Sequence, residues 1–200
     1  MIYIYGDSHA NNCFRNFSLP FIDKHCVSIT MFRIGRDNVI INFDNREHDN
    51  DSIIVMCYGE VDCRCHIQRQ INIGNKEDEI IENLVTNYFK TIKENVKRCK
   101  KIIIVGVIPP INQTEYENLN GPITHEFPFV GSDEDRVRYT LKLNRFLEQK
   151  SIENDYLYFN PYDYYTRTDG TLKYEYSDKN VHLKDNVFFL EKFIELYKTI

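Results

Sequence analysis

Residues 1–9 read Met-Ile-Tyr-Ile-Tyr-Gly-Asp-Ser-His, and they are the strongest indication of the fold class. A run of apolar and aromatic residues ends at once at Gly6, which predicts a short buried β-strand followed by a turn. Ser8 then lies at the carboxyl end of the first strand. In α/β proteins the functional groups gather at the carboxyl ends of the strands. We therefore expect an α/β fold with Ser8 in its site.

Further apolar runs of strand length follow, rich in Ile, Val, Tyr and Phe. They span residues 27–32, 52–58, 102–107 and 156–159, with residues 39–43 as either a short strand or a loop. The runs are continuous rather than alternating, which is typical of strands that helices cover on both faces. This pattern predicts a mainly parallel central sheet.

Apolar residues at three- and four-residue steps predict amphipathic helices between and after these strands. The repeats cover residues 81–96, 133–150 and about 184–198, and Ser132 is a candidate cap for the second helix. Pro109-Pro110 predicts a long loop that runs to Gly131. Strands and helices together predict a three-layer α/β/α sandwich that forms a single domain over residues 1–200.

The 200 residues carry a formal net charge of -5. This charge provides no general attraction to phosphate backbones or anionic lipids, so we expect no nucleic-acid partner and no membrane partner. No run reaches the ~18 consecutive apolar residues that span a bilayer, and no basic segment precedes a long apolar stretch at the amino terminus. We expect a cytoplasmic protein, and the oligomeric state stays open.

The six cysteines are expected to be free thiols, since a chain of this size needs no covalent cross-links. Cys63-Arg64-Cys65-His66 is the stretch that suggests a metal site. However, a single residue between the two cysteines differs from the spacing of most zinc sites, and no second pair completes the set. We expect no metal and no organic cofactor.

A second group of reactive side chains lies near the carboxyl terminus, where Asp178 and His182 precede the last expected helix. A serine hydroxyl becomes a nucleophile when a base removes its proton, and a histidine with a pKa near ~6.5 does so at neutral pH. A carboxylate that accepts a hydrogen bond from the other ring nitrogen sets the tautomer. Ser8, His182 and Asp178 are thus the parts of a serine-nucleophile site. A helix cap at Ser8 and a structural role for His182 are the alternatives.

The chain resembles the SGNH, or GDSL-type, hydrolase family, which carries its serine in a Gly-Asp-Ser block after the first strand and an Asp/His pair before the last helix. Gly6-Asp7-Ser8 matches the first block. The resemblance implies a flavodoxin-like fold with Ser8 as nucleophile, His182 as base and Asp178 as the acid that orients the base. Asp178 and His182 lie four positions apart, whereas the family usually spaces the pair by three.

The resemblance also implies an oxyanion hole built from Ser8, Gly35 and Gly59. The family's third block usually reads Gly-x-Asn-Asp, and here Val61 holds the asparagine position. Loss of one oxyanion donor commonly costs ~3 kcal/mol of transition-state stabilisation. Arg64 or the backbone around Gly59 is a candidate replacement for the missing donor.

Asp62 and Arg64 are candidates for substrate binding, and a buried pair between them that only shapes the loop is the alternative. The resemblance implies hydrolysis of small O-acyl esters, with acetyl esters of carbohydrates as the preferred substrates. Transfer of the acyl group to a sugar hydroxyl is the closest rival, since an alcohol resolves the same acyl-enzyme when water is excluded. A non-catalytic glycan-binding module is a further alternative, which Val61 supports.

Overall fold

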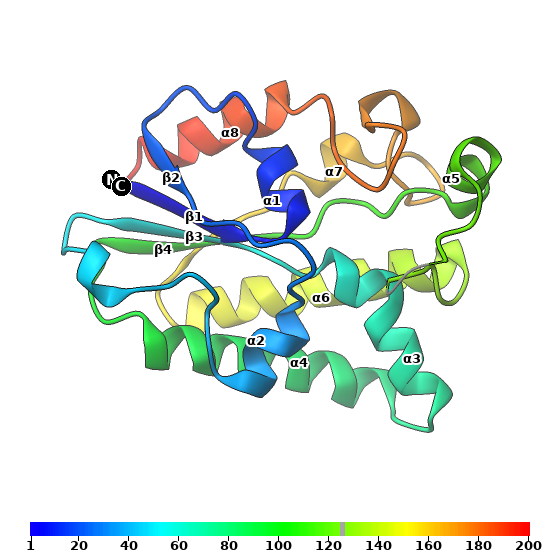
Figure 1. Cartoon of the computed structure of the whole chain (residues 1–200), viewed down its shortest axis with the longest axis horizontal. Helices are drawn as coiled ribbons and strands as arrows, with labels where there is room; N and C mark the ends of the chain where they lie inside the picture. Colours follow the sequence, from blue (N-terminus) through cyan, green and yellow to red (C-terminus); the bar gives the residue numbers. More distant parts are fainter. Residues whose placement is uncertain (125–126) are drawn as a thin grey trace.

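The computed structural model describes residues 1–124 and 127–200, and it shows a parallel five-stranded sheet between two layers of helices (Figure 1). The strands lie in the order β2-β1-β3-β4-β5. They are β1 (Ile2–Gly6), β2 (Phe21–Asp23), β3 (Ile53–Cys57), β4 (Lys101–Val105) and β5 (Leu157–Phe159). The expected three-layer α/β/α sandwich with a mainly parallel sheet is confirmed.

The expected strand over residues 27–32 is wrong, because β2 lies earlier in the chain and helix α2 (Met31–Asp37) begins inside the apolar run. The side chain of Thr30 accepts a hydrogen bond from Arg33 N and so caps α2. Ser28, with a left-handed φ of 63°, turns the chain just before this cap. Residues 39–43 form a loop rather than a strand.

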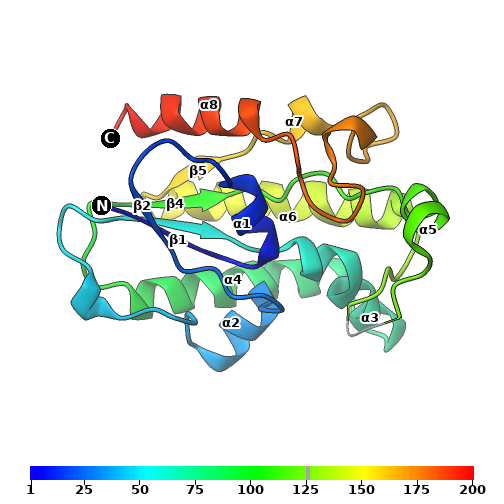
Figure 2. The ribbon, with the colours of Figure 1, turned by 45° about the horizontal axis from the view of Figure 1, so that its top comes forward.

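Two layers of helices cover the sheet (Figures 1 and 2). One layer contains α2, α4 (Glu77–Asn95) and α6 (Asp133–Glu153), and the other contains α1 (Ser8–Cys13), α7 (Tyr162–Tyr165) and α8 (Val187–Tyr197). The apolar repeats correctly predict α4, α6 and α8, and Ser132 caps α6 as expected. Shorter elements are α3 (Ile67–Asn72), α5 (Gln113–Asn120), a π-helical turn (Asp62–His66) and two 3-10 turns (Asn45–Glu47 and Tyr174–Tyr176).

Side chains of β1 enter both halves of the core in alternation. Tyr3 and Tyr5 pack on the α4 side, whereas Ile2 and Ile4 pack on the α8 side. Phe189 and Phe193 of α8 are fully buried on that second side. Burial of each such phenyl ring contributes about 1.5–3 kcal/mol, so α8 is held firmly on the sheet. The segment just before α8 is thereby held near the carboxyl end of β1.

The segment between β4 and α6 contains α5 where a continuous loop was expected. Asn112 caps α5, because its side chain accepts a hydrogen bond from Glu115 N. Residues 125 and 126 of the expected loop lie outside the described residues. Arg136, fully buried, donates to Gly131 O at 2.7 Å and ties the end of this segment to α6. In the described part of the chain, no helix has the length and apolar character needed to cross a membrane.

Candidate active site

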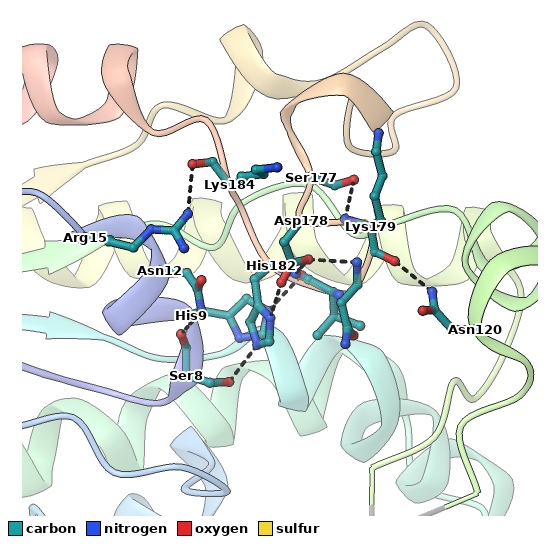
Figure 3. Close-up of polar contacts among 12 residues, drawn as sticks. Ser8, His9, Asn12, Arg15, Asn120, Ser177, Asp178, Lys179, His182 and Lys184 are labelled. Atoms are coloured by element: carbon teal, nitrogen blue, oxygen red, sulfur yellow. Dashed lines mark hydrogen bonds and ion pairs between the residues drawn. The ribbon is translucent and has the colours of Figure 1, made fainter.

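Ser8, His182 and Asp178 form a hydrogen-bonded chain at the carboxyl end of β1 (Figure 3). His182 Nε2 lies 3.0 Å from Ser8 Oγ, and His182 Nδ1 lies 3.0 Å from Asp178 Oδ2. An ionised carboxylate only accepts hydrogen bonds, so Nδ1 carries the ring proton and Nε2 accepts from the Ser8 hydroxyl. This is the tautomer that a general base requires.

Ser8 owes its position to a tight turn between β1 and α1. Asp7 caps α1, because its carboxylate accepts a hydrogen bond from His9 N at 2.8 Å. Gly6 is required at this turn, since a Cβ atom there would overlap the Cβ atom of Ala10. The turn leaves Ser8 half-buried at the first position of the helix.

The loop from Asp178 to His182 closes on itself. Asp178 N donates to His182 O at 3.0 Å, and His182 N donates to Asp178 Oδ1 at 3.2 Å. The loop has one residue more than the family's usual spacing of three positions, and Lys179, with a left-handed φ of 69°, lets the backbone turn to include it. Its Nζ atom donates to Tyr174 O at 2.9 Å and lies 3.6 Å from the centroid of the Tyr174 ring. A spacing of four positions therefore still brings the carboxylate to the imidazole.

Asp178 is ionised at neutral pH. Burial raises the pKa of its carboxyl, but hydrogen bonds from the His182 ring and from Asn180 N outweigh this effect and hold the pKa below its usual range. A negative charge at Asp178 can stabilise an imidazolium at His182. The loop supplies both the orientation of the ring and the charge that balances it.

A cavity of about 230 Å³ opens beside Ser8 and His182. Its other polar lining residues are Ser28, Arg64 and Asn180. Its apolar and aromatic wall is formed by Val27, Val61, Tyr116, Ile123, Phe127 and Val181. The volume lies below the range of about 300–1,000 Å³ that is usual for small-molecule sites, so the cavity suits a short acyl group better than a long chain.

Neither Gly35 nor Gly59 lines this cavity, contrary to the expectation. Because α2 begins at Met31, Gly35 lies inside the helix, where a Cβ atom would be 2.9 Å from the Cβ atom of Asn87 in α4. Gly59 follows β3 with a φ of 123°, and a Cβ atom there would be 2.8 Å from Val107 Cγ2. Both glycines allow close packing against neighbouring elements, and neither is among the residues that line the cavity beside Ser8.

Ser28 borders the cavity where a glycine was expected to do so. Its φ of 63° lies in the left-handed region that glycine adopts without steric cost. Sequence reasoning missed Ser28, since a serine gives no local signal of a left-handed backbone. Because α2 begins a few residues further on, Ser28 lies in the segment before the helix, where it lines the same cavity as Ser8.

Asp62 is fully buried and does not line the cavity, so the expected contact with substrate is not supported. Its carboxylate accepts hydrogen bonds from Met31 N at 2.7 Å and from Phe32 N at 3.1 Å. Burial raises the pKa of Asp62 to about 7, although these two N–H groups oppose the rise. Asp62 therefore holds the start of α2, and the ion-pair partner of Arg64 is Glu60 rather than Asp62.

Four charged residues form a buried charge cluster next to the cavity, namely Asp7, His9, Glu60 and Arg64, each at most 6% exposed. His9 Nδ1 lies 3.3 Å from Asp7 Oδ1, and His9 Nε2 lies 3.4 Å from Glu60 Oε2. Glu60 Oε2 also lies 3.3 Å from Arg64 Nη2. Two carboxylates thus face two basic side chains.

His9 connects the buried charge cluster to the loop that carries His182. Its Nε2 atom donates to Val181 O at 3.0 Å, and the centroids of the His9 and His182 rings are 4.7 Å apart. Burial alone lowers the pKa of His9, but the carboxylates of Glu60 and Asp7 outweigh burial and raise the pKa to about 9. His9 is therefore a buried cation at neutral pH.

The stretch that suggested a metal site is packed into the protein. Cys63 and Cys65 are buried free thiols, and the ring of His66 stacks on Phe32 with 4.0 Å between the centroids. Within residues 1–124 and 127–200, no group of three or more His, Cys, Asp or Glu side chains is placed to hold a metal ion.

No model of a known protein family matches the sequence, and no curated protein sequence matches it significantly. Solved structures match it over nearly its whole length. A GDSL-like lipase from Bacteroides thetaiotaomicron has a TM-score of 0.61 at 16% identity, over 100% of this chain and 88% of that chain. A catalytic mutant of an acetylxylan esterase from Geobacillus stearothermophilus has a TM-score of 0.55 at 14% identity, over 97% and 92%. The OSK domain of Drosophila Oskar has a TM-score of 0.55 at 11% identity, over 98% and 86%.

The chain therefore has the fold of the SGNH, or GDSL-type, hydrolases. At these identities the likeness establishes the fold, and one fold hosts different functions. The reaction has to be argued from the residues of the site.

Proposed function

We propose that this protein is a serine esterase that hydrolyses small O-acyl esters, with O-acetyl esters of carbohydrates as the substrate class. The observation that carries the proposal is the chain of contacts from Ser8 Oγ through the His182 ring to Asp178, each 3.0 Å long. Nucleophile, base and orienting acid stand in the order that acyl transfer needs. The fold supports the proposal, because lipases and an acetylxylan esterase share it.

In the proposed reaction, Ser8 Oγ attacks the carbonyl carbon of the ester while His182 Nε2 takes the hydroxyl proton. The electron pair of the carbonyl bond moves onto its oxygen. Collapse of this intermediate breaks the bond to the leaving alcohol, and His182 returns the proton to the alcohol oxygen. A water molecule then attacks the acyl-enzyme in the same way, with His182 as its base, and releases the acid and Ser8.

The carbonyl oxygen becomes negatively charged in both steps and needs hydrogen-bond donors. We assign the backbone N–H groups of Ser8 and Ser28 to this role, because both residues border the cavity. Asp178 balances the positive charge on His182 during the same steps. This reaction requires no metal and no organic cofactor.

The substrate class rests on the size of the cavity and on one structural neighbour. A volume of about 230 Å³ with an apolar wall favours acetyl over long acyl chains. An acetylxylan esterase has the same fold. We therefore expect kcat/KM for p-nitrophenyl esters to fall from acetate to octanoate, and a preference for octanoate would contradict a small acyl site.

A fluorophosphonate probe tests the nucleophile, since it labels an activated serine covalently. We expect wild type to be labelled and Ser8→Ala to remain unlabelled, with a loss of at least about 10⁴-fold in kcat for p-nitrophenyl acetate. Ser18→Ala, at an exposed serine between α1 and β2, is the matched control and should behave as wild type. A folded wild-type protein that stays unlabelled would contradict the esterase proposal.

Product analysis with an O-acetylated oligosaccharide tests the reaction type. Hydrolysis predicts free acetate at a rate that an added sugar acceptor does not change. An acylated acceptor that forms faster than acetate would replace hydrolysis with acyl transfer.

A further inference from the structure

Arg64 is a buried cation on the wall of the Ser8 cavity, and its donors are not all used. The residue is 6% exposed and lines the cavity. Its Nη2 atom lies 3.3 Å from Glu60 Oε2, whereas its Nε atom has no hydrogen-bond partner within residues 1–124 and 127–200. A guanidinium carries five N–H donors, and a buried donor without an acceptor is costly. This arrangement favours an acceptor that a bound molecule supplies.

The neighbouring wall position provides no donor. Val61 is 4% exposed, lines the same cavity and has an apolar side chain. Among the described residues that line the cavity, the cationic or ionisable basic side chains are those of Arg64 and His182. His182 faces Ser8 Oγ and is engaged in proton transfer in the proposed reaction. In the proposed reaction a negative charge develops on the ester carbonyl oxygen. Arg64 is therefore the charged donor that remains for it.

The backbone on both sides of Arg64 is held in place. Arg64 lies in the π-helical turn Asp62–His66, a wide type of turn that is frequent at functional sites. Asp62 anchors the start of this turn through its two hydrogen bonds to the first residues of α2. Val130 N donates to Arg64 O at 3.0 Å from the opposite side. The guanidinium thus extends from a fixed backbone.

Glu60 holds the guanidinium of Arg64 in place but does not fully neutralise its charge. Its Oε2 atom faces two cations at once, at 3.3 Å from Arg64 Nη2 and 3.4 Å from His9 Nε2. Because the Glu60 carboxylate is shared between two cations, it offsets only part of the positive charge of Arg64. The remaining charge acts on other acceptors nearby. In a buried, low-dielectric site such a field acts strongly on nearby charge.

We propose that Arg64 is an oxyanion-hole residue, which donates N–H hydrogen bonds from its guanidinium to the ester carbonyl oxygen as that oxygen becomes negatively charged. The inference rests on the proposed esterase function. No proton leaves Arg64, because a guanidinium stays protonated in proteins. Its N–H groups hold the oxyanion while Ser8 Oγ is bonded to the carbonyl carbon, and they release it when the carbonyl re-forms. Charge-assisted donors of this kind are stronger than neutral ones.

Substitutions at Arg64 test the inference with a neutral ester, p-nitrophenyl acetate. We expect Arg64→Met to lower kcat about 10²–10³-fold while KM changes less than about threefold, since the lost contact belongs to the transition state. Arg64→Lys keeps a cation beside Glu60 and should fold, but its single ammonium should leave kcat at least about tenfold below wild type. Arg33→Met, at an exposed arginine of α2, is the matched control.

A second-site substitution distinguishes an oxyanion donor from a residue that only supports the fold. Val61→Asn places a carboxamide N–H donor on the same wall of the cavity. In the Arg64→Met background we expect this change to recover at least about tenfold in kcat. Loss of a merely structural contact at Arg64 would not be corrected by a polar donor at position 61.

Labelling of Ser8 by the fluorophosphonate probe separates this inference from the proposed function. If folded wild type is not labelled, the esterase function fails and the role of Arg64 fails with it. If wild type is labelled and folded Arg64→Met and Arg64→Lys keep kcat within about threefold of wild type, only the role of Arg64 is overturned. A loss confined to esters that carry a carboxylate would also overturn it, and would assign Arg64 to binding that carboxylate.

Discussion

The two sides of the site around Ser8 are built in opposite ways. On the outer side, the side chains of Asp178 and His182 are 26% and 19% exposed. On the inner side, the side chains of the buried charge cluster are at most 7% exposed. A group that exchanges protons with substrate and water has to reach both, whereas fixed charges act most strongly where water is excluded. In the proposed reaction, proton transfer and electrostatic stabilisation are therefore divided between an exposed and a buried environment.

The largest expected effect comes from replacing the carboxylate of Asp178 on the outer side. Asp178→Asn should lower kcat for p-nitrophenyl acetate by about 10³–10⁴-fold, because an amide allows the wrong tautomer of His182 and does not balance the imidazolium charge. Asp185→Asn, at an exposed aspartate a few residues further on, is the control and should retain wild-type rates. Activity within tenfold of wild type in Asp178→Asn would remove Asp178 from the mechanism.

The next effect tests the backbone of the outer loop. Lys179→Pro should lower kcat about 10²-fold, because proline fixes φ near −65° and cannot adopt the native value of 69°. Lys179→Gly adopts that conformation freely and should retain activity within about threefold. Steady-state kinetics on the pair separates the backbone from the lysine side chain, and equal losses in both variants would assign the effect to the side chain.

The inner side is tested by the pH dependence of stability. The pKa of His9 is raised from 6.5 to about 9 in the folded protein, so the folded state binds this proton more tightly than the unfolded state. The resulting stabilisation is fully present below pH 6.5 and is lost as pH rises through about 9, and it is on the order of 3 kcal/mol.

Urea unfolding at several pH values between about 6 and 10 measures this effect. Wild type should lose free energy of unfolding across the window, whereas His9→Gln should lack this component, because glutamine does not titrate. If the free energies of unfolding of wild type and His9→Gln change with pH in the same way over the whole window, His9 is not a buried cation.

The smallest expected effect concerns Ser28, which lines the cavity. Ser28→Gly should raise the free energy of unfolding by about 0.5–1 kcal/mol, because glycine adopts the left-handed φ of 63° without steric cost. Ser28→Ala keeps the Cβ atom and should leave stability within about 0.5 kcal/mol of wild type. Thermal unfolding of the two variants makes the comparison, and a destabilised Ser28→Gly would contradict the strain assigned to this residue.

Four of the strands, β1, β3, β4 and β5, and the placement of Ser8 near His182 were predictable because they depend on short stretches of sequence. An apolar run before Gly6 indicates β1, and the apolar repeat of α8 indicates where the preceding loop returns to the sheet. The extent of α2 was not predictable in this way. It depends on the Thr30 cap and on the bonds that Asp62 accepts from Met31 N and Phe32 N, which are distant in sequence. The sequence therefore suggests Gly35 for the oxyanion hole, whereas the residue that lines the cavity is Ser28.

The buried charge cluster was not predictable for a related reason. Glu60 and Arg64 are one helical turn apart, but His9 joins them only through the pairing of β1 with β3. In the sequence these residues are indistinguishable from solvated polar residues near strand ends. Burial is what makes them significant, and burial is a property of the assembled fold.

Ser8 and His182 lie 174 positions apart in the sequence, so a ribosome makes the two side chains at different times. A ribosome releases the amino-terminal part of the chain first, so β1 and its serine emerge long before the loop that carries the imidazole. Until that loop and α8 have docked, the nascent chain holds the hydroxyl of Ser8 without its contact to His182. On the proposed mechanism, a product terminated before residue 182 lacks the base and does not hydrolyse esters.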